Sequence, residues 1–304
     1  MRGLTIVVTY NGMKWYDRCF SSLRASTVPV DIYVFDNAST DGTVDYIRTR
    51  FPEIILHASD VNLGFGQGNN KGMRYALDNG YEFVFLLNQD AWLARNDAIE
   101  QLLIAYKDSS HKGILSTIHF NGSGERITSG MKKDLAGYNS SESDLFSDLY
   151  FKRDLKIVYK VDYACAAAWF IPVETIKEIG GFDPLFFHYG EDDNYMHRLL
   201  YHNLSIGVCP FSGICHDIEH RGDDYSSRLN NWKKNLLVEM SNINKPLSVN
   251  GFILKTFLKS FSRILTFRFK AAILYMNMAI FVCQKRSVIC LHNQENKKKG
   301  NNWL

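Results

Sequence analysis

FVFLLNQDAWL, residues 83 to 93, is a run of five apolar residues followed at once by three polar residues that could bind a metal. A short, continuously apolar run is typical of a buried strand. Asn88, Gln89 and Asp90 stand where that strand ends. Hard divalent cations prefer carboxylate and amide oxygens as ligands. These residues alone leave two interpretations open: a metal site with one carboxylate, or the polar end of a core strand.

The residues before this stretch alternate between short apolar segments and segments of helical periodicity. The sequence predicts helices at 15–25, 43–51 and 67–79 between strands at 4–9, 31–35, 54–57 and 82–87. Apolar strands separated by helices indicate an α/β fold with a mostly parallel sheet covered on both faces. Such sheets bind ligands at the carboxyl ends of their strands. Polar clusters at 9–11, 36–39 and 88–90 each follow a strand, so we expect them to lie together.

The rest of the chain is less regular. It predicts strands at 112–120 and 161–171, a polar loop at 121–154 and a helix at about 192–201. From residue 251 one helical face is basic and the opposite face apolar. We therefore expect one large domain over 1–245 and a basic amphipathic helical segment with a frayed tail over 246–304.

Composition excludes several classes of protein. A formal net charge of +3 is too mild to suggest nucleic acid as a partner. The six cysteines show no paired zinc spacing, so we expect free thiols in a reducing, cytoplasmic compartment. The apolar run at 271–283 is too short to cross a bilayer, so no spanning helix is expected.

Two segments near the predicted strand ends could bind a nucleotide. A carboxylate at Asp36 can accept the imide N–H of a uracil or thymine ring, although it could equally cap the next helix. The loop NLGFGQGNNKG, residues 62–72, has alternating glycines that allow close approach to a ligand, and the helix start after it favours anions. A flexible turn is the alternative. A dinucleotide-binding oxidoreductase is disfavoured, because its glycine motif would follow the first strand, which here ends in Thr-Tyr-Asn.

Two further segments could carry reactive groups. In FFHYGEDD, residues 186–193, three acids open a helix beside aromatic residues. Acids there could be helix-dipole partners, or a general base sheltered by an aromatic wall. His216 in CHDIEH, residues 215–220, could join Asp90 at a metal or could be a structural histidine.

Taken in order, these segments resemble inverting nucleotide-sugar glycosyltransferases of family 2, most of all the rhamnosyltransferase-like branch. The resemblance covers roughly residues 3–220 through VVTYN (7–11), FDNASTDGT (35–43), NLGFGQGNNKG (62–72), FLLNQDA (85–91) and GGFDPLFFHYGEDDNYMHRL (180–199). It implies a GT-A fold and transfer of one sugar from a nucleoside-diphosphate donor, with TDP-rhamnose or a UDP-sugar expected. The implied acceptor is a glycan or lipid-linked glycan in surface polysaccharide synthesis.

The resemblance also assigns roles by motif. Asp192 would be the general base with Glu191 beside it, and Asp90 and His216 would hold Mg²⁺ or Mn²⁺. Because Asn88 replaces the first acid of the family's Asp-x-Asp, we expect weak metal affinity without nucleotide. Trp169 would wall the acceptor site, with a core position as the alternative. The donor would be bound by Thr9, Tyr10, Asn11, Asp36, Asn37, Asn62, Gly64, Asn70, Asn88 and Gln89.

Two alternatives remain from the sequence. The missing acid at Asn88 would also suit a nucleotide-sugar-binding protein without turnover. The basic amphipathic segment at 252–285 would suit a helix lying in a membrane interface, at the inner face of the cell membrane, or a helix packed on the catalytic domain with its lysines in water.

Overall fold

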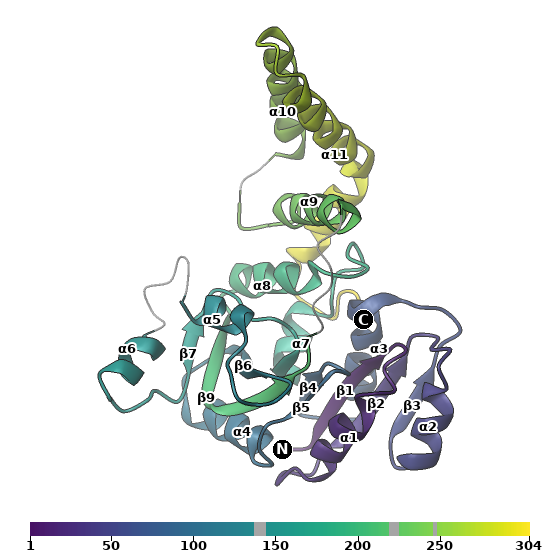
Figure 1. Cartoon of the computed structure of the whole chain (residues 1–304), viewed down its shortest axis with the longest axis vertical. Coiled ribbons are helices and arrows are strands. Elements are labelled where there is room, and N and C mark those ends of the chain that lie inside the picture. Colours follow the sequence, from purple (N-terminus) through teal and green to yellow (C-terminus); the bar gives the residue numbers. More distant parts are fainter. Residues whose placement is uncertain (137–143, 219–224, 246–247) are drawn as a thin grey trace.

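A computed structural model describes residues 1–136, 144–218, 225–245 and 248–304 of the protein, with the backbone alone for 225–231. Figure 1 shows an α/β domain from which a pair of long helices projects. We take the α/β domain first, because its strand ends position the site.

One mixed sheet forms the centre of the domain, with the strand order β3-β2-β1-β4-β8-β6-β9-β5 and β7 beside β9. Its strands are β1 (Gly3–Thr9), β2 (Asp31–Asp36), β3 (Ile55–Ala58), β4 (Phe83–Leu87), β5 (Ala91–Leu93), β6 (Gly113–Asn121), β7 (Tyr159–Val161), β8 (Ala168–Pro172) and β9 (Ser205–His216). The first four run parallel, and β8 runs antiparallel to β4 and β6. The carboxyl ends of β1, β2 and β4 therefore share one edge, and pairing of His216 with Ala91 brings the end of β9 there too.

Helices cover both faces of this sheet. They are α1 (Tyr16–Arg24), α2 (Thr43–Arg50), α3 (Gly64–Asp78), α4 (Ala98–Asp108), α5 (Ser129–Ala136), α6 (Leu145–Tyr150), α7 (Val173–Ile179) and α8 (Glu191–Tyr201). α1, α2 and α4 supply one buried apolar cluster, and α3, α7 and α8 supply a second on the other face. Burying one large apolar side chain contributes about 1.5–3 kcal/mol, so these two clusters hold the strand ends in place.

The predicted elements of the first 90 residues are confirmed to within three residues at each end. The largest shift is at α3, which begins at Gly64 rather than at residue 67. The glycines were expected to let a ligand approach the backbone closely. Most of them instead let other parts of the protein approach it. A Cβ on Gly68 would lie 2.9 Å from Val8, and one on Gly72 would lie 2.6 Å from Ile6. They let α3 lie close against the sheet.

The middle of the chain differs from its prediction. The polar segment 121–154 contains α5 and α6, while 137–143 within it lies outside the described residues. The single strand predicted over 161–171 is two strands, β7 and β8, joined by a turn. Trp169 explains the turn, because its indole N–H donates to the carbonyl of Ala164 at 3.1 Å and folds the chain back onto the core.

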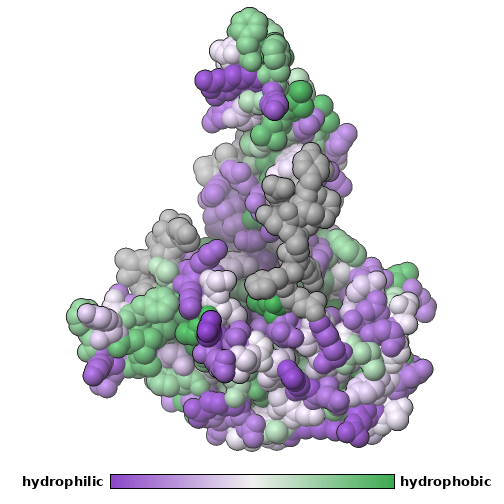
Figure 2. All heavy atoms as spheres, in the orientation of Figure 1, coloured by the Kyte–Doolittle hydropathy of each residue, from purple (hydrophilic) through white to green (hydrophobic). Residues whose placement is uncertain are grey.

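The C-terminal part consists of α9 (Tyr225–Met240), α10 (Val249–Leu265) and α11 (Phe269–Asn296). α10 and α11 form an antiparallel hairpin, which we call the helical hairpin (Figure 1). Small side chains lie buried where the two helices meet: the hydroxyl of Ser260 donates to the carbonyl of Ala272 at 2.8 Å. Larger apolar residues point outward and gather toward the tip (Figure 2). They include Leu254, Leu258, Phe261, Leu265, Phe267, Phe269 and Ile273.

α11 corrects one expectation. Within the described part of the chain it is one helix, 28 residues long, that by length and composition could cross a membrane. The apolar run at 271–283 alone is too short to cross a bilayer, but the helix begins at Phe269 and continues past that run to Asn296.

The predicted frayed tail is also wrong, because the last residues dock on the α/β domain. The amide of Gly181 donates to the carbonyl of Asn302 at 2.8 Å, and that of Gly300 donates to Glu178 at 2.9 Å. Lys299 pairs with Glu178 at 2.6 Å. The proposed boundary at 246 lies outside the described residues, and the segment beyond it returns to the domain it was expected to leave.

Candidate active site

A cavity of about 570 Å³ opens at the carboxyl ends of β1, β2 and β4. It therefore lies where the topology of an open α/β sheet places a ligand. Twelve of its 13 lining residues come from the motifs quoted above, Trp15 being the exception, and all of them come from five short segments. They are Val8, Tyr10, Asn11, Trp15, Asn37, Asn62, Gly64, Phe65, Asn88, Gln89, Asp90, Phe187 and His188.

Gln89 ties the ends of β1 and β4 together. Its side-chain oxygen accepts the amide of Tyr10 at 2.8 Å, and its nitrogen donates to the carbonyl of Tyr10 at 3.1 Å. The hydroxyl of Tyr16 donates to the same oxygen at 3.2 Å. The predicted binding residues Tyr10 and Gln89 thus hold each other, and both still line the cavity.

Asp36 lies directly below the cavity wall and is only 1% exposed. Its carboxylate accepts the hydroxyls of Thr9 at 2.8 Å and Ser39 at 2.6 Å, and the amide of Ser39 at 2.9 Å. A carboxylate has about four lone-pair positions, so about one remains for a ligand. The structure thus gives Asp36 and Thr9 a shaping role below the cavity, and contact with a base stays a prediction.

Asn37 holds the glycine-rich loop against the cavity. Its side-chain oxygen accepts the amide of Leu63 at 2.9 Å, and its nitrogen donates to the carbonyl of Gly64 at 3.2 Å. Asn62 caps the same turn by accepting the amide of Gly64 at 2.8 Å. Gly64 has φ +81°, and a Cβ there would meet the carbonyl of Phe187 at 2.0 Å. Only glycine therefore allows this loop to meet the segment that leads into α8.

The two predicted metal ligands come together. The Nε2 atom of His216 lies 3.3 Å from Oδ1 of Asp90, although 126 residues separate them. Beside them, the buried Oδ1 of Asn88 has no hydrogen-bond partner. One carboxylate, one imidazole and one amide oxygen fit the preferences of a divalent cation such as Mn²⁺ or Mg²⁺. No set of three or more His, Cys, Asp or Glu side chains in the described ranges could hold a metal, so the protein supplies few charged ligands. Glu219 and His220 of the same motif lie outside those ranges.

Acidic groups gather where α8 begins, next to Phe187 and His188 of the cavity wall. Burial, and then the charges of Asp192 and Asp193, raise the pKa of Glu191 to about 7. Burial and the charge of Asp192 also raise the pKa of Asp193 to about 6. On α5, the same two causes raise the pKa of Asp134 to about 6. Glu191 and Asp193 are therefore not merely solvated helix-dipole partners, since burial disfavours their charged forms.

A family model described as Glycosyl transferase family 2 matches residues 5–180. The chain belongs to glycosyltransferase family 2. The matched span includes the cavity residues at the ends of β1, β2 and β4, and stops just before the segment that carries Glu191 and Asp192.

Two curated relatives bear on this family 2 chain. It is 34% identical over 94 residues to the undecaprenyl-phosphate mannosyltransferase of Micrococcus luteus, an alignment that covers 30% of this chain and 38% of that protein. It is 25% identical over 245 residues to the N-acetylglucosaminyl-diphospho-decaprenol L-rhamnosyltransferase of Mycobacterium tuberculosis, which covers 74% of this chain and 79% of that protein. The chain thus spans well under half of the first relative and most of the second.

Solved structures show the fold. The chain superimposes on S. aureus TarS 1-349 in complex with UDP with a TM-score of 0.56 at 17% identity, covering 98% of this chain and 88% of that one. For GalNAc-T7 with UDP, GalNAc and Mn²⁺ the TM-score is 0.60 at 16% identity, covering 78% and 48%. The predicted GT-A fold is confirmed.

Two residues assigned to this family 2 site are structural instead. Asn70 is 3% exposed; its side chain accepts the amide of Phe182 at 2.7 Å and donates to the carbonyls of Phe182 and Trp303 at 2.8 and 2.9 Å. It fastens the chain end to α3 and is not among the residues that line the cavity. Trp169 is fully buried and packs between Phe182 and Tyr195, so the core alternative was right.

The sequence analysis missed three residues of this region. Trp15 lines the cavity and donates its indole N–H to Asp217 at 2.9 Å. His119 is buried beside His216, and its Nε2 atom has no partner. Tyr163 donates its hydroxyl to Asp192 at 2.5 Å. The aromatic residue after the first motif could have indicated Trp15, but no local pattern marks His119 or Tyr163.

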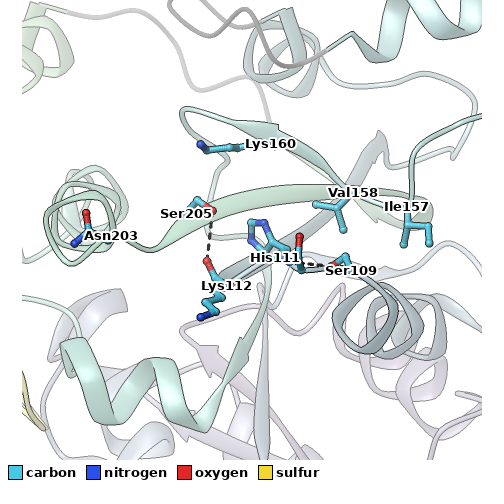
Figure 3. Close-up of a pocket in the computed structure, with 9 residues that line it drawn as sticks. Ser109, His111, Lys112, Ile157, Val158, Lys160, Asn203 and Ser205 are labelled. Carbon is cyan, nitrogen blue, oxygen red and sulfur yellow. Dashed lines mark hydrogen bonds between the residues drawn. The ribbon is translucent and has the colours of Figure 1, made fainter.

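Another hollow, of about 610 Å³, lies at the opposite ends of β6 and β9. Figure 3 shows the amines of Lys112 and Lys160 apart from each other, with Ser205 between them in this view. The ring of His111 is held by its contact with the carbonyl of Ile114 at 2.9 Å. The side chains do not converge on a common point, so the cavity at the strand ends remains the candidate site.

Proposed function

We propose that the protein transfers one sugar, with inversion, from a nucleoside-diphosphate donor to a hydroxyl group of a glycan or lipid-linked glycan in surface polysaccharide synthesis. One observation carries the proposal. Asp90, which pairs with His216, lines the same cavity as Phe187 and His188, which lead directly into Glu191 and Asp192. The residues proposed to act at the diphosphate and those proposed to act on the acceptor thus border the same cavity.

The donor end favours a pyrimidine nucleotide. Asp36 has room for one more donor, which the imide N–H of uracil or thymine would supply, provided that the wall above it opens. TDP-rhamnose is the first donor to test, because a rhamnosyltransferase aligns over 74% of this chain. UDP-sugars come next, because both structural neighbours above were crystallised with UDP.

Asp90 and His216 would hold Mg²⁺ or Mn²⁺, with the unpartnered oxygen of Asn88 close by. A bound divalent cation would supply charge stabilisation for the departing diphosphate. Because the chain offers one carboxylate there, we expect weak metal binding alone and tighter binding with nucleotide. Calorimetric titration of Mn²⁺ with and without UDP measures this difference, and equal affinities would contradict it.

At the acceptor end, Asp192 accepts the proton of the attacking hydroxyl. Attack from the side opposite the leaving diphosphate inverts the anomeric carbon. Glu191 is 4% exposed and carries an unpartnered oxygen, so it is better placed to support α8 and the cavity wall than to take that proton. A general base typically contributes 10²–10⁴-fold to the rate.

The first test is a thermal-shift screen of UDP, TDP, GDP and NAD⁺ with and without Mn²⁺. A ligand that binds the folded state raises apparent stability. We expect a shift with TDP or UDP that grows with Mn²⁺. No shift with either would contradict the donor assignment.

The second test compares Asp192→Asn with Asp193→Asn in sugar transfer from the donor so identified. Both substitutions remove one charge from the first turn of α8. Asp192→Asn should lower transfer by about 10²–10⁴-fold and keep the thermal shift with nucleotide, whereas Asp193→Asn should retain most of the activity. Nucleotide binding without transfer in the wild type would favour a binding protein without turnover.

We also propose that the helical hairpin contacts an anionic lipid surface at the inner face of the cell membrane. Residues 240–294 contain eight Lys or Arg and no Asp or Glu. Large apolar side chains near the tip are exposed, with Phe267 at 83% and Leu265 at 66%. Basic residues beside an exposed apolar tip suit a headgroup layer above a hydrocarbon layer. The base of α11 is fixed to the catalytic domain, so the tip is the part free to enter the lipid.

A further inference from the structure

We propose that Tyr163 is the positioning residue of the general base, holding the carboxylate of Asp192 in one orientation and in its charged form. The inference rests on the proposed function, because it concerns the group that accepts the acceptor's proton. It is based on a hydrogen bond between the loop that follows β7 and helix α8, two segments that no sequence motif connects. The hydroxyl of Tyr163 donates to Oδ2 of Asp192 at 2.5 Å.

The two oxygens of Asp192 are held differently. Oδ1 accepts the amide of Asp193, its own neighbour on α8, at 2.9 Å. Oδ2 is held from outside the helix by the hydroxyl of Tyr163. Each oxygen keeps further lone-pair capacity, so the acceptor hydroxyl can still approach. Tyr163 therefore fixes the rotation of the carboxylate without occupying all of it.

Several acidic side chains lie around Asp192. Asp134 faces it from α5, and Glu191 and Asp193 flank it on α8. The thiol of Cys165 lies close enough for the charge of Asp192 to act with burial in raising its pKa to about 12, so it stays neutral. From α9, Lys234 acts on Asp193. A neutral donor directly on Oδ2 is thus the contact that favours the ionised carboxylate.

A phenol suits this position. Burial and the charge of Asp192 hold the pKa of Tyr163 far above its ordinary value, so the hydroxyl remains a donor at any working pH. Its ring packs against the apolar core beneath α3 and α8. The turn that carries it is anchored by the bond from Trp169 to Ala164, the next residue. The buried tryptophan therefore serves the acceptor side indirectly, by fixing the loop.

The test compares Tyr163→Phe with Tyr159→Phe. The control removes the same hydroxyl from a residue four positions earlier, where it donates to Asp148 at 2.7 Å, outside the site. The first readout needs no substrate: ¹³C NMR titration of the aspartate carboxyls, with Asp192 assigned by its absence in Asp192→Asn. We expect Asp192 in Tyr163→Phe to titrate about one pH unit higher than in wild type. Tyr159→Phe should leave it unchanged.

The second readout is release of TDP from TDP-rhamnose with an N-acetylglucosaminyl diphospholipid as acceptor. In Tyr163→Phe we expect kcat to fall about tenfold, the acid limb of its pH profile to move up with Asp192, and the donor KM to stay within about twofold. An unshifted Asp192 titration, or a faster variant, would overturn the inference. A wild type that releases no TDP in this assay and in a parallel one with UDP-N-acetylglucosamine would count against the proposed function, while the NMR comparison would still decide the role of Tyr163.

Discussion

The α/β domain and the helical hairpin arrange their apolar residues in opposite ways. In the domain, Phe170 is fully buried between Phe83 and Tyr106. In the hairpin, Ser260 and Ala272 are buried, whereas Leu258 is 62% exposed. Helices that meet through small residues and turn large apolar ones outward are typical of a lipid surrounding. The contrast supports the proposal that the hairpin contacts lipid while the domain lies in water.

The most direct test of this contrast is to remove an apolar side chain from each region. Phe170→Ala should lower the free energy of unfolding by about 3–5 kcal/mol, because it leaves a cavity in a packed core. Leu258→Ala should change it by less than about 0.5 kcal/mol, because that side chain already faces solvent. Denaturant titration in detergent-free buffer measures both. A large loss at Leu258 would mean that the hairpin is packed against protein.

Buried acids provide a second contrast. Glu191 has a folded pKa near 7, above the ordinary value of 4.5 for a glutamate. Between these two pH values the folded state binds more protons than the unfolded state, so stability falls as pH rises. In wild type this group should lower the free energy of unfolding by about 3 kcal/mol over that pH range, and Glu191→Gln should abolish that part of the fall. Asp134 and Asp193 keep their own contributions, so the measured quantity is the difference from wild type.

Chemical denaturation at pH 4.5 and pH 8 gives this difference, with Asp45→Asn as the control because that side chain is 90% exposed. The hairpin has no carboxylate between 240 and 294, so lipid binding should not follow the same pH change. A Glu191→Gln curve parallel to wild type would mean that the carboxyl is solvated in solution.

A substitution at the tip of the hairpin tests where the proposed lipid contact lies. Phe267→Ser should weaken flotation with anionic liposomes by about tenfold or more, because a fully buried aromatic side chain contributes about 1.5–3 kcal/mol. Thermal stability should stay close to that of wild type. Phe146→Ser is a matched control, since Phe146 is 41% exposed but lies on α6 in the catalytic domain. Equal losses in both variants would argue against a specific tip.

The smallest effect is expected from single charges. Lys259→Gln should reduce binding to anionic liposomes by about 1 kcal/mol and have little effect with neutral ones. The loss should shrink as salt rises, because salt screens exposed charges. Lys107→Gln on α4 is the control. A loss that is the same on neutral vesicles would assign the contact to apolar burial alone.

Most strands and helices in the first part of the catalytic domain could be predicted from the sequence, because its strands are short and apolar and end in polar clusters. Asp90 of the motif at 88–90 and the distant His216 were predicted to lie together, and their side chains meet at 3.3 Å. Their proximity depends on pairing between β5 and β9, which places His216 opposite Ala91.

What the sequence could not provide depends on contacts between distant segments. Asn70 has the composition of a ligand contact, yet its partners are the carbonyls of Phe182 and Trp303, more than 100 residues away. Tyr163 reaches Asp192 only because a turn interrupts what looked like one strand. Periodicity separated the faces of α10, but it could not tell which face would meet α11.

The hydrogen bond from the side chain of Asn293 to the carbonyl of Met240, at 2.9 Å, has a geometric consequence. The chain leaves the catalytic domain and re-enters it at one point, so the intervening segment is topologically an insertion. Its two helices can gain or lose whole turns in step while both ends stay in place, and each turn would move the tip by about 5.4 Å. The length of the hairpin thus sets the distance between the candidate cavity and the tip.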